Sequence, residues 1–332
     1  MVFSELASRL NDVGYKNWMK AGYCLLKLRN GLKELVSVEM SVFHQNLIKQ
    51  NTVLRAGCIG GCKPRGKQFH PNCSVCREWR NEILSHHTNR NGEINWGNCR
   101  PWLWSSEHWE VAKAYMPRGS ADIQGPDKCD AAALLNLIGF CDHFRFVSQQ
   151  KVREVIKSRN ELMHSSEMSV SSAWIDEYAL KIHDLLNEFR CVPEVKEAAI
   201  EIKKILSSDW AVVLSGRDDV DGIPNMSNED EAVQISTMEI ELLKEKLQEI
   251  LLDKQDVLCE EDISRIGKFR CFLEGSKDLG SHFHAAIQRL LNLEQKKEHK
   301  HQRSNSNDIE AEKHTEDEKS EDPPRKKQKN SV

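Results

Sequence analysis

Apolar residues recur at three- and four-residue steps along most of this chain, a spacing typical of amphipathic α-helices. Proline, which interrupts helices, is scarce, with nine in 332 residues. Residues 16–49 follow the spacing without a proline, so they are predicted to form one long helix, or two that meet at Gly31. The pattern therefore predicts an all-α protein.

Further helices are predicted on the same grounds, and their expected ranges are 77–87, 105–115, 127–140, 149–165, 172–189 and 193–206. Together they make a helical domain over 1–210. Residues 211–234 are rich in Asp, Gly, Asn and Ser, so they are interpreted as a linker. A C-terminal helical region is expected at 235–293, with a short coiled-coil-like seam through Ile240, Leu243, Leu247 and Ile250. The tail at 294–332 has almost no apolar residues and is expected to be disordered.

The charge balance restricts the partners. Lys and Arg number 47 and Asp and Glu 51, so the net charge of −4 excludes a wholly basic nucleic-acid coat protein but allows a local basic site. No apolar run is long enough for a membrane span, so no membrane partner is expected. Eleven cysteines without an export signal favour a reducing, intracellular compartment. A basic run at 325–329 favours the nucleus over the cytoplasm.

The most specific pattern lies at 157–164, which reads Lys-Ser-Arg-Asn-Glu-Leu-Met-His. Asn160 and His164 are four apart and share a helix face. Arg159 could stabilise a charged phosphate transition state with its planar guanidinium, and His164 could transfer a proton near neutral pH. These three residues are the candidate catalytic group, and a cleft at the end of their helix is the expected place.

This pattern resembles a known family. Arg-Asn-x-x-x-His matches the Arg-x4-6-His signature of HEPN domains, and an apolar helix before it and an amphipathic helix after it resemble the layout of the HEPN domain in the DAZ-interacting zinc-finger ubiquitin ligase. Over the whole chain, segments such as YKNWMKAG, NWGNCRP and EHWEVAKAYMPRG resemble an uncharacterised vertebrate protein family encoded by an X-chromosome open reading frame.

The HEPN resemblance implies an antiparallel helical bundle, often a homodimer, that binds RNA. Many HEPN domains cleave RNA without a metal ion, leaving a 2′,3′-cyclic phosphate. Carried over to this sequence, His164 would transfer the proton, Arg159 would stabilise the transition-state charge and Asn160 would position the phosphate. No cofactor would be needed for that reaction.

Other family members only bind RNA, nucleotides or proteins. The alternative is therefore a non-catalytic protein-interaction or scaffold protein of helical-bundle type, in which Arg159 pairs with a neighbour such as Glu154 or Glu161. A run of basic residues could attract RNA phosphates or be a solvated helix face; its members are Arg145, Lys151, Arg153, Lys157 and Arg159.

A cysteine-rich insert at 56–77 is the second candidate site. Cys58, Cys62, Cys73 and Cys76 form two pairs close enough in sequence for four thiolates to hold one structural Zn²⁺, with His70 as a substitute ligand. Since the segment is rich in Gly, Pro and Lys, we expect a metal to supply its order. The alternative is a surface loop with reduced thiols and no metal ion. The basic residues of the insert could also make it the contact surface of a zinc-stabilised adaptor.

Overall fold

The computed structural model describes residues 2–89, 93–210, 226–253 and 259–295. Within these ranges the regular elements are helices, and extended pairing is limited to isolated bridges such as Arg65 with Gln68. The predicted all-α class is thus confirmed. The chain divides into two compact units, Met1–Gln255 and Asp256–Val332, each described by itself below.

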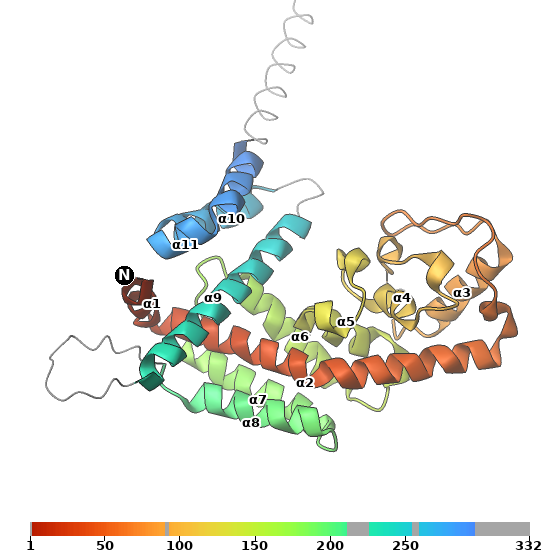
Figure 1. Cartoon of the computed structure of the whole chain (residues 1–332), viewed down its shortest axis with the longest axis horizontal. Helices are drawn as coiled ribbons and strands as arrows, with labels where there is room; N and C mark the ends of the chain where they lie inside the picture. The colour runs from red at the N-terminus through yellow and green to blue at the C-terminus, as the bar shows by residue number, and fades with distance from the viewer. Residues whose placement is uncertain (1, 90–92, 211–225, 254–258, 296–332) are drawn as a thin grey trace, which may run out of the picture. The chain divides into compact units, whose positions relative to one another are not determined.

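The first unit is organised around one helix, α2, which spans Val13–Gln50 (Figure 1). The Asp12 side chain begins α2 by accepting a hydrogen bond from the Tyr15 amide at 2.7 Å, which satisfies one of the first-turn N–H groups. The other helices of this unit are α1 (Val2–Leu10), α3 (Ser74–Ser85), α4 (His108–Ala112), α5 (Ala131–Phe140), α6 (Gln149–His164), α7 (Ser172–Glu188), α8 (Pro193–Ser207) and α9 (Met226–Asp253). Helix α2 contacts α1 and each of α4 to α9, so it is the spine of the core.

Gly31 does not break α2. A Cβ atom at Gly31 would lie 2.8 Å from the Ala198 Cβ of α8 and 3.2 Å from the Glu194 carbonyl oxygen. The missing side chain therefore lets α2 and α8 approach closely, which is the packing reason for a glycine within a long helix.

Side chains cap the starts of two further helices. Asp130 and Ser171 are the N-cap residues of α5 and α7, and each accepts a hydrogen bond from the backbone amide three residues later. Helix α4, by contrast, begins at His108 after Glu107 without a side-chain cap, so it starts later than the predicted range 105–115. The helix predicted over 105–115 is instead α4 followed by a 3₁₀ turn, Lys113–Tyr115.

Helix α9 changes the expected domain boundaries. Residues 211–225 of the expected linker lie outside the described residues, whereas 226–234 are helical and begin α9. The first compact unit extends to Gln255, so α9 belongs to it and not to a separate region beginning at 235. In Figure 1, α9 crosses α2, with which it is in contact.

The face of α9 that is buried also differs from the predicted seam. Over 232–252, where its side chains are described, the buried ones are Ala232, Ile235, Met238, Glu239, Leu242, Leu243 and Lys246, and of the predicted seam residues only Leu243 is among them. A Cβ at Gly22 of α2 would lie 2.7 Å from Leu242, so this glycine admits α9 to close contact with the spine.

The second unit holds α10 (Glu260–Glu274), α11 (Lys277–His282) and a helical stretch at 284–295. Its core is made of Ile266, Phe269, Leu273, Leu279, Phe283, Ile287 and Leu290. Residues 296–332, which include most of the expected tail and the basic run at 325–329, lie outside the described residues. Among the helices described, none has the length and apolar character needed to cross a membrane.

Candidate functional site: an arginine–histidine cleft and a four-cysteine cluster

A cleft of about 420 Å³ lies in the first unit, where the end of α6 meets the loop at 117–123, the start of α5 and the last turns of α9. Arg159, Asn160 and His164 all line this cleft, as the motif predicts. The remaining lining residues are Pro117, Arg118, Gly119, Ser120, Ile123, Lys128, Asp130, Ala132, Asn136, Glu245, Gln248, Glu249 and Leu252. The structure thus brings the three candidate catalytic residues together in one concavity.

The end of α6 is fixed by donors from two other helices. Carbonyl groups in the last turn of a helix have no intrahelical partner. The Trp18 indole of α2 donates a hydrogen bond to the Leu162 oxygen at 2.9 Å, and the Lys246 ammonium of α9 donates to the Met163 and Ser165 oxygens at 2.6 and 2.7 Å. These contacts hold the turn that carries His164 at the cleft.

Arg159 is buried but lies in a polar environment. Its Nη1 atom is 2.8 Å from the Glu249 carboxylate, and its Nη2 atom is 3.5 Å from Asp130 Oδ2. Arg159 does not pair with Glu154 or Glu161, the partners that the sequence suggested. Those two carboxylates contact Gln150 and Trp174 respectively. The partners of Arg159 come instead from α9 and from the N-cap of α5.

His164 and Asn160 are more exposed. The His164 side chain is 42% exposed, and its Nε2 atom lies 3.4 Å from Glu249 Oε1. Asn160 is exposed, with its Oδ1 atom 3.5 Å from Arg159 Nη1. The Glu249 carboxylate therefore bridges the arginine and the histidine of the motif.

A second carboxylate on α9, that of Glu245, lines the same cleft one turn before Glu249. Burial raises the pKa of Glu245 to about 7, the Asp130 carboxylate adds to the rise, and the Arg159 guanidinium opposes it. Glu245 can therefore take up or release a proton near neutral pH, which is the property expected of a group in a general acid–base site.

The loop wall of the cleft is ordered by buried polar contacts. Asn98 donates through its side-chain nitrogen to the Pro117 oxygen at 2.8 Å and accepts from the Ser120 amide at 3.1 Å. Lys113, fully buried, donates to Glu110 at 2.7 Å and to the Ala121 oxygen at 2.9 Å. Since each buried charge has a partner, the loop is held in one conformation beside α9.

The predicted basic run along 145–159 is mostly offset by acid. Lys151 pairs with Glu188 at 2.6 Å and Lys157 lies 3.8 Å from Glu161. Arg145 lies 3.5 Å from Asp142. These pairs reduce the positive potential that the sequence alone indicated.

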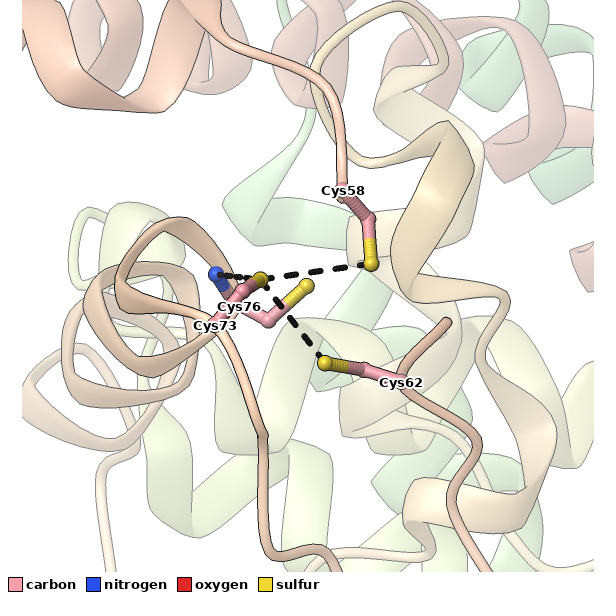
Figure 2. Close-up of side chains that lie close together, drawn as sticks. All are labelled: Cys58, Cys62, Cys73 and Cys76. Carbon is pink, nitrogen blue, oxygen red and sulfur yellow. Dashed lines mark hydrogen bonds between the residues drawn. The ribbon is translucent and has the colours of Figure 1, made fainter. Parts of the chain in front are cut away.

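The four predicted cysteines converge, although they come from a loop and a helix start. Figure 2 shows the sulfur atoms of Cys58, Cys62, Cys73 and Cys76 directed toward one another. All four lie within 4.8 Å of each other, and the Cys62 and Cys73 sulfurs are 3.7 Å apart. Tetrahedral thiolate coordination of zinc requires sulfur separations of roughly 3.7–3.8 Å, so this group has the donor set and the spacing to hold one metal ion. His70 is exposed and is not part of the cluster.

Backbone amides favour the thiolate form of Cys73, whereas burial raises the pKa values of the Cys62 and Cys76 thiols. Cys73 is the N-cap of α3, and its Sγ atom accepts a hydrogen bond from the Cys76 amide at 3.4 Å. Burial raises the pKa of the Cys73 thiol, but hydrogen bonds from Cys76 and Cys62 outweigh it and bring the pKa to about 6. The Cys62 sulfur accepts a further hydrogen bond from the Asn72 amide at 3.2 Å. Such outer contacts orient sulfur ligands in metal sites.

The insert also has an apolar anchor that the sequence analysis missed. Phe69 is buried against Trp96 and Trp104, with ring centroids 5.5 and 5.6 Å apart. Trp79 of α3 stacks on His44 of α2 at 5.6 Å. An aromatic cluster therefore ties the segment to the spine, so the order of the segment does not depend on a metal ion alone.

Comparison with known proteins identifies the family. Residues 9–312 match the model of a domain of unknown function, DUF4559. The chain belongs to this family. A protein of Mus musculus described as an uncharacterised CXorf38 homologue is similar to it, being 49% identical over 300 residues, which cover 88% of this chain and 93% of the mouse protein. No solved structure matches the chain.

For this DUF4559 chain, sequence reasoning located the α6 residues and the cysteines but missed Asp130, Glu245 and Glu249 as parts of the cleft. One signal was present. Glu245 and Glu249 are four apart on one helix, and like charges at that spacing repel each other unless a cation or a proton offsets them. The spacing alone could not indicate that Arg159 supplies the cation.

Proposed function

We propose that this protein is a HEPN-like RNA-binding protein that holds a phosphodiester of RNA in the cleft and cleaves it without a metal ion. The observation that supports the proposal is the convergence of Arg159, Asn160 and His164 on one cleft of about 420 Å³. That volume lies within the range of small-molecule sites, about 300–1,000 Å³, and suits one nucleotide of a flexible strand better than a duplex.

The chemistry follows from the side chains. The Arg159 guanidinium would bind two phosphate oxygens and stabilise the extra negative charge of the phosphorane. His164, more exposed than Arg159, would accept the 2′-hydroxyl proton as the 2′-oxygen attacks phosphorus, and that proton would pass to the departing 5′-oxygen. The products are a 2′,3′-cyclic phosphate and a 5′-hydroxyl end. Asn160 would orient the phosphate.

The test is a binding and cleavage assay with a fluorescent single-stranded RNA of mixed sequence, in buffer without divalent cations. We expect cleavage by the wild type and none by His164→Ala, with the ends identified by mass spectrometry. His183→Ala is the matched control, because His183 is an exposed histidine of α7 away from the cleft. Equal cleavage by the wild type and His164→Ala would refute the proposed role of His164.

A second candidate function is favoured by the ion pairs of Arg159. An arginine already paired with Glu249 and Asp130 can be purely structural, as in a protein-interaction module of helical-bundle type. Absence of RNA binding by the wild type and by every variant would favour this function.

We further propose that the four cysteines bind one structural Zn²⁺ rather than a catalytic one, because four thiolates complete the tetrahedral shell. Metal analysis of the purified protein should give one zinc per chain, and Cys73→Ser/Cys76→Ser should lose it. The double variant Cys191→Ser/Cys259→Ser, at two exposed cysteines outside the cluster, should retain it. A folded wild-type protein without zinc would refute the metal site.

A further inference from the structure

We propose that Glu249 of α9 is an internal competitor for the anion that the cleft binds, so that the described conformation is autoinhibited. The inference rests on the proposed function, since it concerns the same cleft, and it assigns the regulation of that cleft to this chain's own helix.

The first argument is the position of the carboxylate. Glu249 lies 2.8 Å from Arg159 Nη1 and 3.4 Å from His164 Nε2, so one anionic group contacts the two residues that would bind and process a phosphate. Carboxylate and phosphate are both recognised by the planar donor fork of arginine. A phosphate that binds the Nη1 donors of Arg159 must therefore displace the Glu249 carboxylate.

The second argument is the way α9 is held in register. Lys246 precedes Glu249 by three residues, is 3% exposed, and donates to the Met163 and Ser165 carbonyl oxygens at the end of α6. A buried ammonium on the last carbonyls of a helix is favoured by the negative end of the helix dipole. Both residues lie on the face of α9 that meets α6. The Lys246 contact therefore fixes the position of α9 along its axis, and with it the position of the Glu249 carboxylate relative to Arg159.

The third argument comes from the opposite wall of the cleft. Gly119 adopts a left-handed backbone conformation with φ of 93°, and a Cβ at this position would lie 2.7 Å from Leu252. The last turn of α9 therefore lies directly against the 117–123 loop. Glu249 lies between these two anchored points, so its carboxylate is placed by the packing of the helix on both sides.

The charges around Arg159 oppose an incoming anion. The cations Arg118 and Lys128 also line the cleft, but within 3.5 Å of the Arg159 guanidinium lie two carboxylates, those of Asp130 and Glu249. A phosphate entering this arrangement meets like charge until Glu249 withdraws. Removing the charge of Glu249 while keeping the helix in place should therefore strengthen anion binding.

The test uses inorganic phosphate as the probe and the full-length chain. Its affinity is measured from the phosphate dependence of the melting temperature, for the wild type, Glu249→Gln and Glu241→Gln. The last is the matched control, because Glu241 is an exposed carboxylate of the same helix that does not line the cleft. We expect Glu249→Gln to bind phosphate about tenfold more tightly, as when one charge-assisted contact no longer competes, and Glu241→Gln to match the wild type.

The double variant Arg159→Gln/Glu249→Gln should lose the gain, because the freed anion site is the guanidinium. An equal or weaker affinity in Glu249→Gln would overturn the inference and would indicate instead that Glu249 orients His164. A gain that persists without Arg159 would also overturn it. If Glu249→Gln loses its helical circular dichroism, Glu249→Asp decides, since it keeps the charge but draws the carboxylate back and should give a smaller gain of the same sign.

Binding of RNA to the same variants separates the two proposals. A phosphate gain without any RNA binding would leave the autoinhibition standing and would refute the proposed RNA function. RNA binding that depends on Arg159, with no gain in phosphate affinity in Glu249→Gln, would support the RNA function and refute the autoinhibition.

Discussion

Replacing Lys246 by methionine should loosen α9 from the rest of the first unit. Methionine has a similar length and can occupy the same buried channel, but it has no donor for the Met163 and Ser165 oxygens. The substitution removes two short hydrogen bonds from a charged group and leaves two carbonyl oxygens at the end of α6 without this donor.

The magnitude follows from these contacts. Hydrogen bonds to a charged group contribute about 1.5–3 kcal/mol each, and part of that gain offsets the cost of burying the ammonium in the native protein. The net loss in the docking free energy of α9 should therefore be about 2–3 kcal/mol, which raises the opening equilibrium constant about 30- to 150-fold. The effect should be local, because most of the core around α2 is made by helices other than α9.

Hydrogen exchange followed by mass spectrometry measures this opening directly. In Lys246→Met, peptides from 232–252 should exchange faster by the stated factor, while peptides from α2 and α8 should be unchanged. Lys244→Met is the matched control, since Lys244 is an exposed lysine of the same helix. Unaltered exchange in α9 of Lys246→Met would refute the argument that this lysine sets the register of the helix. Uniform acceleration across the first unit would refute the argument that α9 opens by itself.

Three further outcomes follow from the structure. Gly31→Ala should destabilise the first unit by about 1–2 kcal/mol in urea unfolding, because the overpacking against Ala198 exceeds the gain in helix propensity. Gly267→Ala of α10 should not be destabilising, because the nearest atom there is the end of a flexible glutamate side chain. The raised pKa of Glu245 means that the folded protein holds this proton more tightly than the unfolded chain, so stability should fall as pH rises from about 4.5 through 7, and Glu245→Gln should flatten that part of the profile measured by thermal unfolding. Chelation of the proposed zinc ion should accelerate hydrogen exchange at 56–77 but leave α6 unchanged, and faster exchange throughout the first unit would contradict the anchoring of the insert by aromatic contacts.

Local chemistry allowed the sequence to predict much of the fold. The helix expected at 172–189 is α7, and Ser171 caps it by accepting a hydrogen bond from the amide three residues later, so the signal and its effect lie in the same short window. Gly31 shows the limit of this reasoning. Its role depends on Ala198 of α8, and a helix-breaking residue can be distinguished from a packing glycine only when the partner is known.

The buried face of α9 could not be predicted from periodicity, because periodicity assigns charged residues to solvent. Glu239 is fully buried and pairs with Arg9 at 2.6 Å, 230 positions away, while the Tyr15 hydroxyl donates to the same carboxylate. Lys246 is buried because it donates to the carbonyl oxygens of Met163 and Ser165, which lie far from it in sequence. Such long-range contacts bury charged residues that periodicity assigns to solvent, and the predicted seam through Leu247 and Ile250 was based on that assignment.

The candidate site divides in the same way. Arg159, Asn160 and His164 lie within six residues of one helix, and the cysteine pairs are close in sequence, so their convergence follows from local geometry. Glu249 comes from 85 or more positions along the chain, and no property of the 157–164 segment indicates it. The motif therefore predicted three of the residues that line the cleft but not the carboxylates of α9 beside them.

The length of α2 has a consequence for how chains of this family can vary. At 1.5 Å per residue its 38 residues extend about 57 Å, with Trp18 at the cleft end and His44 at the cysteine-rich end. Inserting or deleting one residue between them would rotate everything beyond it by about 100° and would separate one end from its partners. Relatives should therefore differ in length within the loops around this helix but not within it, and the cysteine cluster and the cleft should be inherited as a unit.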